Sequence, residues 1–238
     1  MNIYISPEHK NWITFELKMI FRNRRPRNTM LFYVLGYAAL ILVYLASEYQ
    51  VLLYNYLLIS SVYFTYSPLM FSWESKYYGS IYSKNIMIRD LIKSKIRVLQ
   101  LINIAFLLLL IPFILFEPAQ LAVLSLLTVF NAGIYPYTDV LLSSYNKRKV
   151  SLNKGMAFSL EGNDFLNTVS ACKTIFIGIL IYLIIEIIPG SYRLILPGIL
   201  SMAGLFNFLL CPKLWVNKIE DNLHKRKYLM LEGFRFHD

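Results

Sequence analysis

Charged residues are scarce in this sequence. Only 16% of the 238 residues are Asp, Glu, Lys or Arg, while 57% are hydrophobic. A water-soluble domain carries about 25% charged residues, so this composition excludes an ordinary soluble globular protein. The chain has the composition of an integral membrane protein.

Cysteine and histidine are also rare, which limits two kinds of site. Cys172 and Cys211 fall in apolar stretches next to the side that the basic residues mark as cytoplasmic, where thiols stay reduced. The histidines His9, His224 and His237 form no cluster with carboxylates at metal-ligand spacing. We therefore expect neither a disulfide framework nor a metal site.

Catalytic motifs are missing as well. The sequence has no GxxxxGK[ST] loop for nucleotide phosphates, no GxSxG elbow and no paired carboxylates inside an apolar run. The chain is therefore not expected to hydrolyse ATP alone, to hold a cofactor or to act as an enzyme.

Long apolar runs are what the sequence has instead. A bilayer core about 30 Å thick needs about 20 mostly apolar residues per helix, and six runs qualify, at about 29–46, 51–71, 99–116, 121–142, 167–188 and 194–211. The sequence thus predicts an all-α membrane protein with six spans in a domain over residues 29–211. Residues 1–28 and 212–238 flank that domain.

The basic residues give an orientation. Of the 24 Lys and Arg residues, 22 lie before the first run, after the second, after the fourth or after the sixth. Lys and Arg accumulate in cytoplasmic loops, so both termini and the basic tail 212–238 are expected in the cytoplasm. A basic inner rim facing anionic lipid accounts for the net charge of +10 without nucleic acid.

The segment before the first run predicts an amphipathic helix that lies in the membrane interface. Its expected apolar and basic faces are Ile13, Leu17, Ile20 and Phe21, opposite Lys18, Arg22 and Arg25. Such a helix is either an anchoring and topology signal or an elbow that moves with the spans and contacts a cytoplasmic partner.

The basic segment between the second and third runs, SWESKYYGSIYSKNIMIRDLIKSK, predicts two helices separated by a break. The first, over about 74–83, presents aromatic and apolar side chains, and Gly79 permits close approach of another surface. The second begins near Met87 and continues through Lys95 into the third span. The alternatives are a lever-like element and a solvated basic loop.

This arrangement resembles the permease subunits of the type-2 family of ABC exporters. Glu74, Lys76 and Gly79 match the head of that family's coupling-helix motif, and Arg89 and Lys95 match its end. The stretches ITFELKMIFRNRRPR, WES and YNKRKVSLNKG are similar to uncharacterised ABC permeases of the Bacteroidetes. The family's proline and serine between the two loop helices are replaced here by residues 85–88.

The resemblance implies an exporter of a hydrophobic or amphipathic substrate in the bacterial inner membrane. It implies a separate ATPase subunit that binds ATP and Mg²⁺, and a second permease subunit that is either identical or a close paralogue, with membrane lipids around them. The expected ATPase-coupling residues are Glu74, Lys76, Tyr77, Tyr78, Gly79, Ile81, Tyr82, Arg89 and Lys95. The alternative function is a membrane scaffold or a lipid-processing membrane enzyme.

Charged residues within or beside the spans are candidate functional groups, because they are costly in lipid. Asp139 and Lys173 lie at similar depth in the fourth and fifth spans, so they either pair or reach separately to the interface. Glu186 and Arg193 flank the last outer connection and are the candidate outer gate.

Tyrosines recur on the first two spans. We expect them either to pack as interfacial aromatics or to line a substrate path with their hydroxyl groups. The two sets are Tyr33, Tyr37 and Tyr44 on the first span, and Tyr56, Tyr63 and Tyr66 on the second.

Overall fold

The structure is a computed structural model, and it describes residues 10–24, 26–28, 30–31, 34–36, 51–75, 78–79, 88–114, 118–147, 149–150, 165–188 and 192–235. Within these ranges the chain forms helices and turns and no β-strand. The predicted all-α class is therefore confirmed. The helices are α1 (Lys10–Arg22), α3 (Val51–Thr65), η1 (Ser67–Leu69), α4 (Met70–Trp73), α6 (Ile88–Ile114), α7 (Pro118–Ser143), α8 (Phe165–Ile187), α9 (Ile195–Leu210) and α10 (Pro212–Arg235).

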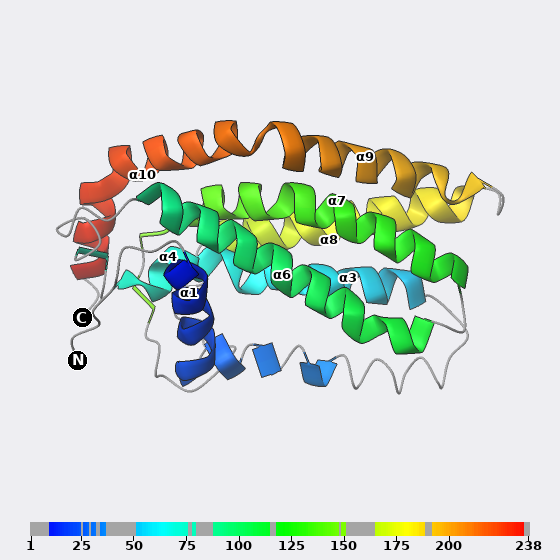
Figure 1. The fold of residues 1–238 in the computed structure, drawn as a ribbon, viewed down its shortest axis with the longest axis horizontal. Coiled ribbons are helices and arrows are strands. Elements are labelled where there is room, and N and C mark those ends of the chain that lie inside the picture. Colours follow the sequence, from blue (N-terminus) through cyan, green and yellow to red (C-terminus); the bar gives the residue numbers. More distant parts are fainter. Residues whose placement is uncertain are drawn as a thin grey trace.

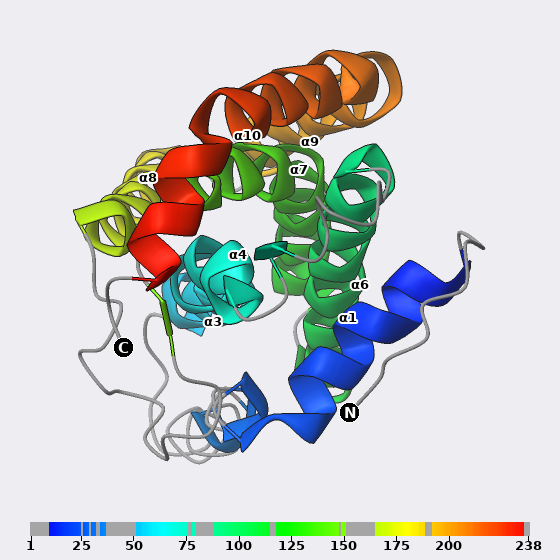
Figure 2. The same ribbon diagram turned by 90° about the vertical axis from the view of Figure 1, so that its left-hand side faces the viewer.

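The long helices lie side by side around α7. Figure 1 shows α3, α6, α7, α8 and α9 running along the long axis of the molecule. Helix α7 packs against α9, α6 and α3, and α3 also packs against α8. Helix α1 lies outside this bundle and crosses α6, as the end-on view in Figure 2 shows.

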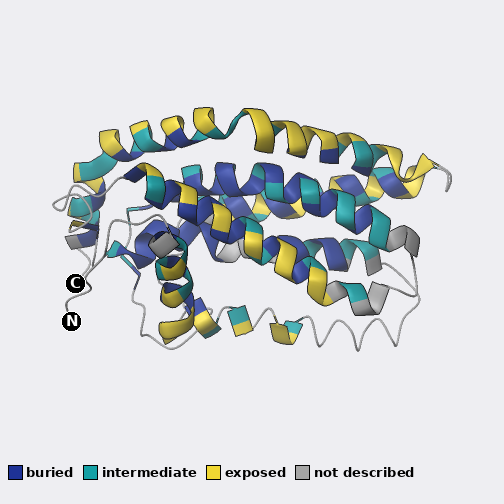
Figure 3. Cartoon of the chain, viewed as in Figure 1, coloured by how far each residue is buried: buried dark blue, intermediate teal, exposed yellow. Residues whose placement is uncertain are grey.

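Figure 3 shows that one side of each long helix is exposed and the other is buried. Large apolar side chains lie on the exposed sides, and polar side chains are among the buried residues. On α7 the buried residues include Asn131, Asp139 and Ser143. This distribution suits a hydrocarbon surrounding, where exposed apolar groups carry no penalty and polar groups must find partners inside the protein. The exposed apolar side chains of α6, α8 and α9 include Leu101, Ile104, Leu108, Phe176, Leu183, Met202, Phe206 and Leu209.

Among the described residues, two helical stretches, Leu121–Ser143 and Thr168–Ile187, are long and apolar enough to cross a membrane. Helices α9 and α10 together make a third candidate if the pair, bent by 68° between them, is taken as one broken span. These stretches match the predicted fourth and fifth spans, and α9 matches the sixth. Most of the predicted first span, 29–46, lies outside the described residues.

The predicted second span, 51–71, is not one continuous helix. Helix α3 ends at Thr65, and the 3-10 turn η1 with Pro68 in its middle leads into the short α4. Proline has no backbone N–H to donate and its ring clashes with the preceding turn of an α-helix. The break places the chain after η1 at the end of the bundle, where α1 crosses.

The buried face of α1 overlaps the predicted one and is rotated from it. Ile20 is buried, and Ile13 and Leu17 pack partly buried against the core, as expected. Trp12, Glu16, Met19 and Ile20 are buried, whereas Phe21 is 64% exposed. The buried positions follow the three- and four-residue spacing of a helix face. They are rotated from the predicted face because the contact with α6 selects the side that carries Glu16.

The C-terminal segment, predicted only as a basic tail, contains the 24-residue helix α10. Its buried side is formed by apolar residues at helical spacing, and this side faces α6 and α7. The tail is therefore an integral part of the fold. These buried residues are Val216, Ile219, Leu223, Met230 and Phe234.

Helices α7 and α9 touch through their backbones at Gly133 and Gly204. A Cβ atom on Gly133 would lie 2.2 Å from the carbonyl oxygen of Gly204, and one on Gly204 would lie 2.7 Å from Cα of Phe130. The Asn207 side chain donates a hydrogen bond to the Gly133 carbonyl at 2.6 Å. Small residues allow this close approach, which is common between helices in membranes.

Candidate functional site

Three charged side chains from separate parts of the chain meet at one buried point. Nζ of Lys95 on α6 lies 2.7 Å from Oε1 of Glu16 on α1 and 2.6 Å from Oε1 of Glu74, which follows α4. None of the three residues is more than 2% exposed. We refer to Glu16, Glu74 and Lys95 as the ion triad, and it joins α1, the end of α4 and α6.

Local structure explains why these side chains point inward. Glu16 shares the buried face of α1 with Trp12 and Ile20, and Lys95 shares the buried face of α6 with Leu91 and Ile92. The backbone N–H of Glu74 donates to the Phe71 carbonyl at the C-terminus of α4, and the Glu74 carboxylate contacts Lys95. The triad therefore lies where the three elements pack together.

Aromatic residues enclose the ion triad. Nζ of Lys95 lies 5.1 Å from the centroid of the Phe71 ring, a geometry that stabilises a cation. Tyr66 and Trp73 pack edge to face with ring centroids 4.6 Å apart, and both are buried. The charges are therefore largely removed from water.

The triad has two carboxylates for one ammonium, so its full ionisation would bury one net negative charge. Burial raises the pKa of Glu74 to about 8, with Lys95 opposing the shift and Glu16 adding to it. Burial alone would lower the pKa of Lys95, but the two carboxylates outweigh burial and raise it. Near neutral pH the raised pKa of Glu74 favours its protonated form, which reduces the net negative charge buried around Lys95.

The remaining described coupling residues also contact this chain itself. Tyr78 is buried: its hydroxyl donates to Sδ of Met230 at 3.1 Å, and its ring packs against Phe234 at 5.3 Å between centroids. Arg89 donates to Glu220 from Nε at 3.1 Å and from Nη2 at 2.8 Å, and Nη2 also donates to Asn217. Both residues thus bind α10.

Three of the expected coupling residues are buried within the chain itself. These residues are Glu74, Tyr78 and Lys95, and in this conformation their side chains contact the chain's own helices. Among the described residues, a Cβ on Gly79 would meet Leu231 at an ordinary 3.7 Å. The close approach of a partner surface to Gly79 stays a prediction. The other predicted coupling residues, Lys76, Tyr77, Ile81 and Tyr82, lie outside the described residues.

A second buried cluster lies between α3, α7 and α8. Lys173 forms an ion pair with Oδ1 of Asp139, which is fully buried, while the Lys173 side chain is 24% exposed. The sequence places these two residues at a similar depth in the predicted fourth and fifth spans, and the structure brings them into contact. Asp139 also accepts hydrogen bonds from Ser67 at 3.2 Å and from Ser170 at 3.3 Å. Each carboxylate oxygen therefore has a partner, which stabilises a buried charge.

Tyr56 and Tyr63 extend this polar region along α3. The Tyr56 hydroxyl lies 3.2 Å from Oδ1 of Asn131 and 3.1 Å from the hydroxyl of Tyr135. The Tyr63 ring packs edge to face on Tyr135 at 5.2 Å. Tyr56, Tyr63 and Tyr66 are buried inside the bundle, so each has a packing role in this conformation. The first-span tyrosines, Tyr33, Tyr37 and Tyr44, lie outside the described residues.

The candidate outer gate is a loose surface pair. Nη2 of Arg193 lies 3.8 Å from Oε2 of Glu186, and both side chains are 48% exposed. Exposed ion pairs at this distance contribute about 0–1 kcal/mol. The two residues meet as the sequence indicated, and their contact is weak.

Sequence reasoning missed Glu16. A signal was present, since Glu16 is the one acidic residue between Lys10 and Arg27 and it interrupts an otherwise apolar and basic helix. An acidic group on a helix face that packs against protein requires a cation as partner. The pattern does not reveal that Lys95, 79 residues later, is that cation.

The fold and the buried charges define an all-helical protein with helices apolar enough to cross a membrane. A family model matches residues 10–237, and the chain therefore belongs to DUF5687, a family of unknown function. Comparison with curated proteins and with solved structures gave no match.

Proposed function

We propose that this chain is the permease subunit of an ATP-binding-cassette exporter. It crosses the bacterial inner membrane six times with both termini in the cytoplasm, and it works as a dimer with two separate ATPase subunits. Those subunits bind ATP and Mg²⁺, and their closure drives a hydrophobic or amphipathic substrate outward.

The ion triad is the observation that carries this proposal. A permease without a nucleotide site must receive work from its partner through a cytoplasmic segment that is firmly attached to the spans. Glu74 stands at the start of such a segment, and Lys95 holds it to both α6 and α1. Removing one partner from a buried ion pair costs about 3–5 kcal/mol. A force on the segment is therefore transmitted to α1 and α6 together.

Helix α10 strengthens the same connection. Tyr78 packs on Met230 and Phe234, and Arg89 binds Glu220, so α10 holds the segment at two places. In the proposed complex the ATPase contacts the segment that includes Tyr78 and Gly79, next to α10. The buried coupling residues stiffen this segment, and the aromatic residues at 77 and 82 provide contacts to the ATPase.

The polar region at Asp139 and Lys173 supports a transport role. It lies between α3, α7 and α8, and Lys173 is its partly exposed member. Ionisable groups at this depth commonly mark the path of a substrate or a conformational switch. We assign the pair to the inner end of the transport path.

Co-purification with a partner ATPase tests the proposal. The chain is co-expressed with each ATP-binding-cassette ATPase encoded beside it, and complex formation and ATP hydrolysis are measured. We expect a stable complex with the original chain and loss of the ATPase from a Tyr77→Ala, Tyr82→Ala variant. Tyr192→Ala, a 57% exposed tyrosine at the opposite end of the bundle, is the matched control. Absence of any complex with the original chain would overturn the proposal.

A further inference from the structure

One exposed stripe of α6 changes from basic to apolar along the helix. Lys93, Arg97, Leu101, Ile104 and Leu108 follow each other at four- and three-residue spacing, so they share one face. All five are exposed. Two cations followed by a run of apolar side chains is the pattern of a helix that passes from a lipid headgroup region into hydrocarbon.

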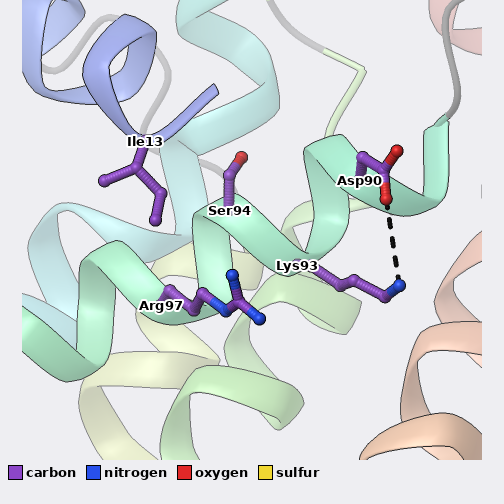
Figure 4. Close-up of a pocket in the computed structure, with 5 residues that line it drawn as sticks. All are labelled: Ile13, Asp90, Lys93, Ser94 and Arg97. Carbon is purple, nitrogen blue, oxygen red and sulfur yellow. Dashed lines mark ion pairs between the residues drawn. The ribbon is translucent and has the colours of Figure 1, made fainter. Parts of the chain in front are cut away.

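The basic end of this stripe borders a cleft between α1 and α6. The cleft has a volume of about 320 Å³ and is lined by Ile13 from α1 and by Asp90, Lys93, Ser94 and Arg97 from α6. Figure 4 shows Lys93 and Arg97 extending from the same side of α6, with Ile13 above Ser94. The cleft thus has an apolar side chain from α1 on one side and, from α6, two cations, one carboxylate and one hydroxyl on the other.

The charges in the cleft favour an anion. Lys93 lies 3.8 Å from Asp90, a distance that leaves a weak ion pair, and the Lys93 side chain remains 48% exposed. Arg97 makes no ion pair with any of the described residues and is exposed. Ser94 donates its hydroxyl hydrogen to the Leu91 carbonyl at 2.8 Å, so an anion would be held by the two cations. A guanidinium is suited to two parallel hydrogen bonds with a phosphate.

We propose that this cleft binds the phosphate-bearing headgroup of an acidic phospholipid. The headgroup phosphate lies between Lys93 and Arg97, and the acyl chains lie along Leu101, Ile104 and Leu108. The apolar continuation of the stripe favours a lipid over a free phosphate ion, because only a lipid has chains to cover it. The inference rests on the proposed crossing of the membrane by α6.

Competition binding with purified full-length protein in neutral detergent tests the site. A fluorescent phosphatidylglycerol is displaced by unlabelled phosphatidylglycerol, by phosphatidylcholine with the same chains, or by inorganic phosphate. Each interfacial cation strengthens the binding of acidic lipid about fivefold. We therefore expect Lys93→Gln and Arg97→Gln each to weaken binding about fivefold and the double variant about 25-fold. Lys213→Gln and Lys225→Gln, exposed lysines on α10, are the matched controls and should bind normally.

Several results would overturn the inference: unchanged binding by the double variant, equal losses in the α10 controls, or equal displacement by phosphatidylcholine or inorganic phosphate. Thermal denaturation of the double variant checks that it remains folded. The assay contains no ATPase, so failure to bind lipid leaves the ATPase partnership standing. A single cysteine at Leu108 separately reports whether α6 crosses the membrane, since lipid should shield it from a water-soluble thiol reagent.

Discussion

Replacing Lys95 with methionine removes the cation of the ion triad at nearly constant side-chain volume. The carboxyl groups of Glu16 and Glu74 then remain buried without a counter-charge. Glu74, with a pKa of about 8, is already largely protonated at pH 7. Removing one partner of a buried ion pair leaves an uncompensated charge in the interior, which costs about 3–5 kcal/mol.

The same reasoning gives a pH dependence. At pH 5 protonation of a stranded carboxylate is easier than at pH 7, so less buried charge remains without a partner. We therefore expect Lys95→Met to lower the midpoint of thermal unfolding by about 10 °C at pH 7 and by only a few degrees at pH 5, relative to the original chain at each pH. The assay is thermal denaturation of the purified protein in detergent.

Two variants make this prediction specific. Lys93→Met changes an exposed lysine two residues away on α6 and should have little effect at either pH. Replacing Glu16, Glu74 and Lys95 together with methionine should recover most of the loss, because an apolar cluster has no stranded charge. A triple variant as unstable as the sum of the three single variants would refute the reasoning, as would a Lys95→Met penalty independent of pH.

The remaining predictions concern three separate places. Asp139→Asn and Lys173→Met should each destabilise the purified protein by about 3–5 kcal/mol. The double variant should lose less stability than the sum of the two single losses, and strictly additive losses would show that the pair is not coupled. The raised pKa of Glu74 means that the folded state binds this proton more tightly than the unfolded state does. The contribution of protonated Glu74 to the free energy of unfolding should therefore fall as pH rises from about 4.5 to about 8. Glu74→Gln should flatten this part of the pH profile of thermal unfolding, and an unchanged profile would contradict the assigned protonation. Gly133→Ala places a Cβ against the α9 backbone and should lower the unfolding midpoint. Gly198→Ala, whose Cβ would meet no described residue within 4 Å, should be neutral or stabilising; equal effects would show that the glycine contact is unimportant.

The helical class and the pairing of Asp139 with Lys173 could be derived from the sequence. Apolar run length sets the helices, and counting residues at about 1.5 Å each places two charges at the same depth in neighbouring helices. Glu186 and Arg193 also meet, because only a short connection separates them. These features depend on local pattern or on short separation along the chain.

The ion triad and the docking of α10 could not be derived in this way. Both depend on which side of an amphipathic helix packs against residues that are far away in the sequence. Periodicity alone does not identify that side when polar and apolar residues are mixed around the helix. For α1, the contact with Lys95 decides in favour of the face with Glu16. For Tyr78, the contact with Met230 turns an expected surface anchor into a buried one.

Cross-linking from one position tests the proposed permease role most directly. A single cysteine is placed at Ser80, within the segment between Glu74 and Lys95, in a chain whose Cys172 and Cys211 are replaced with serine. In membranes that contain the partner ATPase, we expect Ser80→Cys to react only from the cytoplasmic side and to cross-link to the ATPase, with a yield that changes when ATP binds. A cysteine at Ser191 should be reached only from outside and should not cross-link. Labelling of Ser80→Cys from outside, or no cross-link to the ATPase in either nucleotide state, would contradict the account.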